Sequence, residues 1–233
     1  MTTVTAVMPV KRLGAAKSRL ELPDARRRAL ALAFAVDTVT AVAASPMVGD
    51  VVVITSDPVV AWHLRRLPVR LVPDEGGGLD AVVRDGTRVA SSWRPGSGVA
   101  VFPADLPCLR PADVTDVLTR AAVAPATFVP DRSGTGTTAV VHQPGSVPAT
   151  GYGPGSARRH LALGLLALPE APAGARHDVD TLADLEAARR LGVGVRTAAV
   201  LETAEPAVAA GVAAGVTDPG EGALRPPRWQ PTP

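Results

Sequence analysis

The spacing of apolar positions predicts that strands and helices alternate along the first half of the chain. Short apolar runs bounded by Gly, Pro or Asp predict buried strands at 4–8, 51–55 and 98–105. Between and after them, apolar residues recur at helical spacing over 24–44, 58–67 and 78–93, and Asp24 stands where it can cap the first helix. This alternation predicts an α/β fold with a mainly parallel sheet covered by helices on both faces.

The second half of the chain has a different pattern. Two short strands, at 126–131 and 137–143, flank a Gly/Thr turn, and a loop at 151–161 follows them. Thr181 and Asp184 form a capping box for a helix that Gly192 ends. After residue 197 the chain is rich in Ala, Pro and Gly. We therefore predict one domain over 1–196 and a mobile extension over 197–233, with an ordered helical arm as the alternative.

Composition narrows the class of protein. A chain of 233 residues with 46% hydrophobic content can bury one sizeable core. The net charge is only +2, and the arginine run 26–28 precedes an apolar helical pattern with few aromatic residues, so we expect a solvated helix face rather than a nucleic-acid contact. The lone Cys108 excludes an intramolecular disulfide and is expected to be buried. Without a signal-peptide or membrane-spanning pattern, we expect a soluble, cytoplasmic protein; homo-oligomerisation stays open.

The loop after the first strand holds both lysines of the chain, in "PVKRLGAAKSRL" at 9–20. It is not a Walker loop, because Ala16 stands where that loop needs Gly, and it lacks the G-x-G-x-x-G fingerprint. Instead, Lys11, Arg12, Lys17 and Arg19 suit a loop that holds a polyphosphate by side-chain charge. The alternative is that arginine-rich codon usage left two lysines here by chance.

Aspartates follow other segments that we expect at the same edge of the sheet. Asp105 comes directly after the third strand, and Asp178 and Asp180 precede the capped final helix. Mg²⁺ takes oxygen ligands and usually binds one or two carboxylates together with substrate phosphates, so two aspartates from separate segments suit a metal held against a nucleotide. Each aspartate alone has a simpler interpretation, as a helix cap or as a charge beside a helix N-terminus.

Seven short blocks, in order, resemble the phospholactate/phosphoenolpyruvate guanylyltransferases of the pathway to the deazaflavin coenzyme F-420. They are "PVKRLGAAKSRL", "TSD" (55–57), "GGGLDAV" (76–82), "ADLP" (104–107), "DRSGTGTTA" (131–139), "GPGSARRH" (153–160) and "DVDTLADL" (178–185). The resemblance covers residues 4–195. It implies a single α/β domain of the nucleotide-diphospho-sugar-transferase (GT-A) type, which joins GTP to a small phosphorylated carboxylic acid and releases pyrophosphate.

The resemblance also implies roles for particular residues. Lys17, Asp105 and Asp180 are the expected catalytic group, with the two aspartates as Mg²⁺ ligands and Asp178 ranked below them. The expected nucleotide-binding residues are Lys11, Lys17, Arg19, Gly78 and Asp80, and the expected acceptor-binding residues are Thr137, Gly153 and Ser156, with Arg158 and Arg159 nearby. The family usually has Asn at the position of Asp80, where an aspartate can accept hydrogen bonds from guanine, and often has Asn at Thr138.

The acceptor is the least determined part of the prediction. Ser156 begins a helical pattern whose N-terminal amides suit an anion, although a surface loop with a routine serine cap has the same pattern. The arginine, alanine and proline bias suggests a GC-rich genome, as in actinobacteria, where the resembling enzymes are associated with phosphoenolpyruvate; we prefer it to 2-phospho-L-lactate or 3-phosphoglycerate. The alternatives are a molybdenum-cofactor-type nucleotidyltransferase, which more often opens with a Gly-rich loop, and a non-catalytic GTP-binding module.

Overall fold

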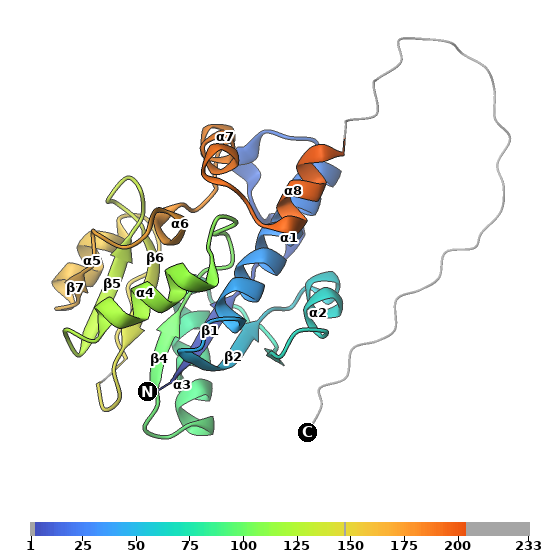
Figure 1. Cartoon of the computed structure of the whole chain (residues 1–233). Coiled ribbons are helices and arrows are strands. Elements are labelled where there is room, and N and C mark those ends of the chain that lie inside the picture. Colours follow the sequence, from blue (N-terminus) through green and yellow to red (C-terminus); the bar gives the residue numbers. More distant parts are fainter. Residues whose placement is uncertain (1–2, 147, 204–233) are drawn as a thin grey trace, which may run out of the picture.

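The computed structural model describes residues 3–146 and 148–203, which form a seven-stranded sheet with helices on both faces (Figure 1). The strand order is β3-β2-β1-β4-β6-β5-β7. The strands are β1 (Val4–Pro9), β2 (Val48–Ile54), β3 (Arg70–Val72), β4 (Gly98–Val101), β5 (Ala126–Pro130), β6 (Thr137–His142) and β7 (Leu166–Ala167).

The sheet is mixed and mainly parallel, as predicted. β1 pairs in parallel with β2 and β4, β2 with β3, and β5 with β7, whereas β6 runs antiparallel between β4 and β5. All residues of β1 and β4 are buried, as expected for strands covered on both faces. The strand order reverses between β1 and β4, so a crevice is expected beyond their carboxyl ends.

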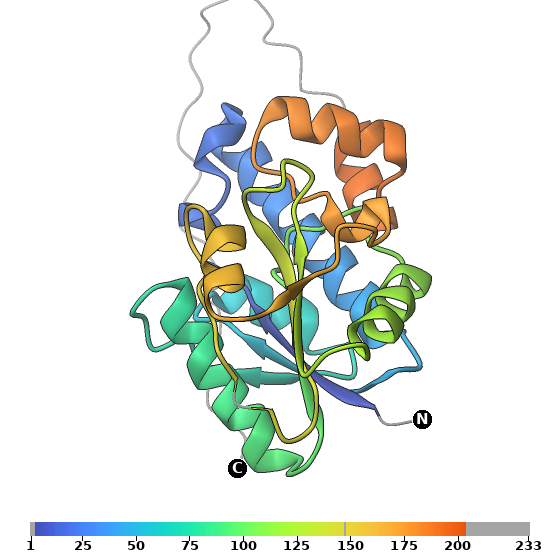
Figure 2. The same cartoon turned by 90° about the vertical axis from the view of Figure 1, so that its left-hand side faces the viewer.

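Helices cover the two faces of the sheet in separate layers. The helices are α1 (Asp24–Ala43), α2 (Pro58–Leu64), α3 (Leu79–Trp93), α4 (Pro111–Ala121), α5 (Ser156–Ala162), α6 (Ala173–Arg176), α7 (Leu182–Leu191) and α8 (Val195–Glu202). One apolar core joins α1, α2 and α4 to the sheet, and a second core joins α3 and α5 to its other face. Figure 2 shows α3 and α5 on one side of the sheet and α1 and α4 on the other.

Several predicted helix ends agree with the structure, and one differs. The capping box of Thr181 and Asp184 is present, and Gly192 ends α7 with φ of 97°. Asp24 is not a cap: Pro23 occupies the cap position, and Asp24 is the first helical residue. Its carboxylate instead forms ion pairs with arginines of the first turns of α1. This placement suits the charge of a helix N-terminus.

The ordered domain extends beyond the predicted boundary at residue 196. That boundary falls inside α8, which lies along α1 (Figure 1). Asp37 of α1 accepts hydrogen bonds from the backbone N–H groups of Arg196 (3.0 Å) and Thr197 (2.8 Å), which anchors the start of α8. The predicted extension after Thr203 lies outside the described residues. In the described ranges, no helix is both long enough and apolar enough to cross a bilayer.

A third, smaller core lies where the loops beyond β1 and β4 meet α1 and α7. It contains Leu20, Cys108 and Val179 together with Leu30, Phe34, Leu185 and Ala188. The Cys108 thiol donates a hydrogen bond to the Ala188 carbonyl (3.4 Å), and burial raises the pKa of this thiol to about 11, so it is a packing group as predicted. This core joins the three segments that carry the lysine loop, Asp105 and Asp180.

Candidate active site

Lys17 joins three segments that are far apart in the sequence. Its ammonium donates to Asp105 Oδ2 (2.6 Å) and to Asp180 Oδ1 (2.9 Å), across separations of 88 and 163 residues. Arg19 also donates to Asp180. The Lys17 side chain is 9% exposed, so its two contacts are partly shielded from water, whereas Arg19 is largely exposed. The structure therefore brings together the three residues predicted to be catalytic, beyond the ends of β1 and β4.

The lysine loop holds a strained backbone at its centre. Two short 3₁₀ turns, Leu13–Ala15 and Ser18–Leu20, flank Lys17. Lys17 itself has φ of 56° and ψ of 35°, in the left-handed region that residues with a Cβ avoid by roughly 1–2 kcal/mol. Such a conformation persists where the surrounding structure imposes it, and it aims the ammonium at the two aspartates.

Arg27, on α1, supports this loop. The prediction that the arginine run 26–28 forms a solvated helix face is therefore wrong for Arg27. Its side chain is only 12% exposed. The guanidinium donates to the carbonyl oxygens of Leu13 (3.4 Å), Gly14 (3.4 Å) and Ala16, and it pairs with Asp24. The run of three arginines did not show which of them contacts the loop. The one available indication was that Arg27 lies one turn into the helix that follows the loop.

The "TSD" block gives the loop a second support. Asp57 caps α2 through the backbone N–H groups of Val59 (2.9 Å) and Val60 (3.2 Å). Its other carboxylate oxygen accepts the Leu13 N–H (2.9 Å), while Arg12 Nε donates to Ser56 Oγ (2.9 Å). The start of α2 therefore fixes the first half of the lysine loop.

The Asp105 segment is held by backbone contacts on both sides. The Leu106 N–H donates to the hydroxyl of Thr38 (3.1 Å), a buried residue of α1. The Val179 N–H donates to the Asp105 carbonyl (3.2 Å), so the Asp105 and Asp180 segments are joined directly. The two carboxylates consequently share a rigid backbone frame.

The site carries more negative charge than Lys17 neutralises. Burial lowers the pKa of Lys17, but Asp105 and Asp180 outweigh this effect and leave the pKa above its ordinary value. Burial opposes ionisation of Asp180, yet Lys17 and Arg19 hold its pKa below the usual range. Burial, together with Asp105 and Asp180, raises the pKa of Asp178 to about 7. A further cation in this cluster would relieve the repulsion between these carboxylates.

The donor set suits Mg²⁺, which stays a prediction. Asp105 and Asp180 each place an oxygen within 2.9 Å of one cationic atom, so both can face one ion. All the available donors are oxygens, which hard divalent cations prefer. Among the described residues, no group of three or more His, Cys, Asp or Glu side chains could hold a metal alone, so water or substrate oxygens would complete its coordination.

A small cavity brings Lys11 and Gly78 together. It has a volume of about 100 Å³. Its lining residues are Pro9, Val10, Lys11, Asp74, Gly76, Gly78, Leu79 and Val82. Gly76, Gly77 and Gly78 all have φ near 90°, a conformation that suits Gly because it lacks a Cβ. The predicted nucleotide residues Lys11, which follows β1, and Gly78, which precedes α3, therefore border one hollow.

Asp80 has protein partners in the structure. Its carboxylate accepts hydrogen bonds from the Thr150 hydroxyl and from the Tyr152 N–H (3.1 Å), which joins the loop before α5 to the first turn of α3. This gives Asp80 a structural role, while guanine recognition by it stays a prediction.

The predicted acceptor residues gather at the start of α5, around a histidine that sequence analysis left out. Gly151 N–H donates to His160 Nε2 (3.1 Å), so Nδ1 is assigned the proton and donates to Thr137 Oγ1 (2.9 Å). His160 is fully buried, and Ser156, the first residue of α5, is also buried. Gly153, with φ of 118°, lies in the loop that leads to Ser156.

Tyr152 places a buried phenol beside the acceptor residues, with its ring centroid 5.2 Å from that of His160. Its side chain is buried, and its hydroxyl has no hydrogen-bond partner among the described residues. Burial raises the pKa of this phenol, and the nearby carboxylates of Asp105 and Asp80 raise it further. A neutral O–H donor therefore lies within electrostatic reach of Asp105. Sequence analysis gave no sign of it, because Tyr152 reads as one residue of a Gly-rich loop.

Comparison with known proteins assigns the family. Residues 4–164 match the family described as "Guanylyl transferase CofC like". The chain belongs to this family. A phosphoenolpyruvate guanylyltransferase of Salinispora arenicola is 47% identical over 213 residues, covering 88% of this chain and 97% of that protein. One of Streptomyces coelicolor is 48% identical over 200 residues, covering 84% and 94%. The chain is therefore a nucleotidyltransferase of the CofC-like family.

Solved structures support the same fold. A putative nucleotide-diphospho-sugar transferase from Desulfovibrio desulfuricans matches with a TM-score of 0.65 at 17% identity, covering 86% of this chain and 94% of that one. A 4-diphosphocytidyl-2C-methyl-D-erythritol synthase matches with a TM-score of 0.55 at 17% identity, covering 82% and 98%. The predicted fold, a single nucleotide-diphospho-sugar-transferase-like domain, is confirmed.

Arg27→Lys is expected to raise the KM of this CofC-like enzyme for its nucleotide about tenfold. A lysine cannot span the carbonyls that the Arg27 guanidinium joins, and loss of one or two hydrogen bonds to a charged group corresponds to about this factor. Steady-state kinetics provide the measurement. The matched control is Arg28→Lys, because Arg28 is 53% exposed and its one ion pair within the described part of the chain is with Asp24. Equal kinetics in the two variants would contradict a positioning role for Arg27.

His160 makes folding stability depend on pH. Burial lowers the pKa of its imidazole to about 4, against 6.5 when unfolded. Between pH 4 and pH 6.5 the imidazole is protonated in the unfolded state but not in the folded state. The contribution of His160 to the free energy of unfolding is therefore fully present above pH 6.5 and is lost as the pH falls toward 4. We expect His160 to contribute a loss of about 2 kcal/mol between pH 7 and pH 5. Denaturant unfolding at the two pH values measures it, and His160→Gln should weaken the dependence. An unchanged dependence would show that other groups cause it.

Proposed function

We propose that this CofC-like enzyme transfers the guanylyl group of GTP to phosphoenolpyruvate and releases pyrophosphate. The contact of Lys17 with both Asp105 and Asp180 carries the proposal, because it places a cation and two carboxylates that could hold an ion at one point beyond the ends of β1 and β4. The family match and the names of the relatives support guanylyl transfer with phosphoenolpyruvate. We further propose that the product belongs to coenzyme F-420 biosynthesis.

The reaction brings two anions together. A phosphate oxygen of phosphoenolpyruvate attacks the α-phosphorus of GTP and forms a new P–O bond, while the bond to the β-phosphate breaks and pyrophosphate leaves with the electron pair. Two like charges about 4 Å apart repel by roughly 4 kcal/mol at an effective dielectric constant near 20. The chain must therefore supply positive charge where both reactants meet.

Residues from separate segments of the chain can share this task. Lys17 and Lys11 would bind the nucleotide phosphates, and Lys17 can leave its aspartates for a phosphate oxygen when an ion takes its place. Asp105 and Asp180 would hold Mg²⁺, which when bound neutralises phosphate charge and favours the in-line geometry. Transfer of this kind needs positioning and charge neutralisation rather than a protein nucleophile.

The acceptor residues offer neutral hydrogen-bond donors. With His160 Nδ1 donating to its oxygen, the Thr137 hydroxyl can give its own proton to an acceptor anion. The unpartnered Tyr152 hydroxyl is a second donor, and it stays protonated because its pKa is raised. We propose that these groups, with the buried N-terminal end of α5 at Ser156, orient the phosphoenolpyruvate.

A pyrophosphate-release assay tests the proposal. GTP, ATP and CTP are each combined with phosphoenolpyruvate, 2-phospho-L-lactate or 3-phosphoglycerate, with Mg²⁺ or with EDTA. The highest kcat/KM is expected for GTP with phosphoenolpyruvate, with no release when acceptor or Mg²⁺ is left out. A preference for 2-phospho-L-lactate would contradict phosphoenolpyruvate as the acceptor. Equal rates with all three nucleotides would contradict the proposed specificity for guanine. No pyrophosphate release with any of these combinations would contradict the proposed nucleotidyl transfer.

A further inference from the structure

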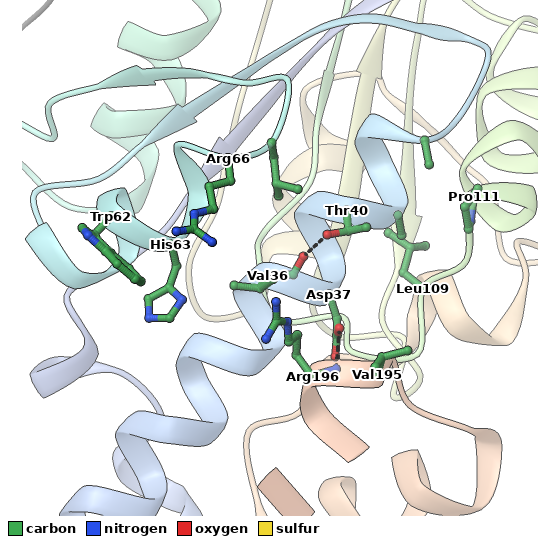
Figure 3. Close-up of a pocket in the computed structure, with 13 residues that line it drawn as sticks. Val36, Asp37, Thr40, Trp62, His63, Arg66, Leu109, Pro111, Val195 and Arg196 are labelled. Atoms are coloured by element: carbon green, nitrogen blue, oxygen red, sulfur yellow. Dashed lines mark hydrogen bonds between the residues drawn. The ribbon is translucent and has the colours of Figure 1, made fainter. Parts of the chain in front are cut away.

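A second, larger cavity lies between helices, and its lining includes none of the residues of the candidate active site. Its volume is about 650 Å³, within the usual range of small-molecule pockets. The lining comes from α1, α2, the start of α4 and the start of α8 (Figure 3). It consists of Val36, Asp37, Thr40, Ala41, Ala44, Trp62, His63, Arg66, Leu67, Leu109, Pro111, Val195 and Arg196.

One end of this cavity is cationic. Figure 3 shows His63, Arg66 and Arg196 directed toward a common space. In the ranges that the structure describes, neither Arg66 nor Arg196 forms an ion pair, although Arg66 lies 5.5 Å from the ring centroid of Trp62. Burial lowers the pKa of His63, and the two arginines lower it further. Among the described residues, no salt bridge therefore neutralises either guanidinium group at this end.

The one carboxylate in the lining is already engaged. Both oxygens of Asp37 accept backbone N–H groups from the start of α8, at 3.0 and 2.8 Å. Asp37 is thus a structural anchor between α1 and α8 rather than a partner for the guanidinium groups. An anion that enters the cavity would meet the two arginines without having to displace a salt bridge.

Part of the lining is apolar. Figure 3 shows Leu109 and Pro111 on the side away from His63 and Arg66. Ala41, Ala44 and Leu67 also line the cavity, and the Trp62 side chain, 46% exposed, stands beside the cationic end. Anion-binding arginines next to an apolar floor suit a ligand that has a charged group at one end and an apolar body at the other.

We propose that this cavity binds a small organic anion with an aromatic or other flat apolar body. The anionic group contacts Arg66 and Arg196 beside Trp62, and the body lies over the α1 floor. The convergence on a concave, partly apolar space of two guanidinium groups that form no ion pair with the described residues favours this ligand class over a purely apolar molecule.

The test is a titration of ¹⁵N-labelled full-length protein with naphthalenesulfonate, followed through the indole N–H signal of Trp62, which is assigned by its loss in Trp62→Phe. We expect a saturable shift. We also expect the Kd to rise at least about tenfold in Arg66→Ala and in Arg196→Ala. Arg65→Ala is the matched control, because Arg65 lies 4.9 Å from the same indole ring centroid but does not line the cavity. Its Kd should change less than about twofold.

Further measurements separate the contribution of the anionic group to binding from that of the apolar body. Thr40→Phe fills the cavity from an exposed position of α1 without removing a charge, and it should abolish the shift. Naphthalenemethanol tests the apolar body alone, and methanesulfonate tests the anion alone; both should bind far more weakly. The proposal is overturned by the absence of a saturable shift, by equal Kd values in the Arg65 and Arg66 variants, or by a neutral probe that binds as tightly as the sulfonate.

Discussion

Asp105→Asn is expected to lower kcat at least about a thousandfold, the largest effect that the structure suggests. The amide keeps the shape of the side chain but removes one of the two charges that face the Lys17 ammonium. A metal ion supplies several kcal/mol of transition-state stabilisation, and each 1.4 kcal/mol is about a factor of ten in rate. The measurement is steady-state pyrophosphate release at saturating GTP, phosphoenolpyruvate and Mg²⁺.

The matched control for this variant is Asp116→Asn. Asp116 is a carboxylate on the surface of α4 that pairs with Arg120 one turn away, so its loss should leave the rate unchanged. Thermal unfolding of both variants checks that the fold is intact. A folded Asp105→Asn enzyme with wild-type turnover would exclude Asp105 as a metal ligand.

Lys17→Ala is expected to lower kcat/KM for GTP about a hundredfold. The variant loses the buried cation that we propose moves from the aspartates to a phosphate oxygen, and a hydrogen bond to a charged group in a water-excluded site is worth roughly this factor. It also leaves Asp105 and Asp180 without their cation. Mg²⁺ binding without substrate should therefore become tighter, because the ammonium no longer competes for the same oxygens.

Calorimetric titration with Mg²⁺ and steady-state kinetics measure these opposite changes. The control is Arg88→Ala, an 80% exposed cation of α3, which should alter neither quantity. A general loss of fold would weaken Mg²⁺ binding together with activity. Weaker binding in a folded Lys17→Ala protein would mean that Lys17 supports the ion instead of occupying its place.

The periodic parts of the chain were predictable because their signals are local. A buried strand such as β1 needs only a short apolar run between breakers, and the capping box of α7 is complete within four residues, from Thr181 to Asp184. The start of α1 was misplaced by one residue because Asp24 suits both the cap and the first turn. Most of helix α8 was assigned to the extension, because the helix is short and its apolar face is recognised as a buried surface only from its packing against α1.

The site could be predicted in part. The blocks around Lys17, Asp105 and Asp180 carry chemistry that is recognisable from residue type and from position after a strand. Arg27 was missed because its partners are backbone carbonyls, which no residue type reveals. His160 was missed because its role depends on its burial and on its contact with Thr137, and neither is visible in the sequence.

The amino-acid sequence by itself determined the alternation of strands and helices, the charged loop after β1, the candidate carboxylates and the resemblance to a guanylyltransferase family. Only the tertiary structure decided which of these charges meet. Lys17 reaches Asp105 and Asp180 because the shared core of Leu20, Cys108 and Val179 packs their segments together beyond the sheet. Local patterns report propensity and burial, whereas contacts across 88 and 163 residues depend on how the whole chain packs.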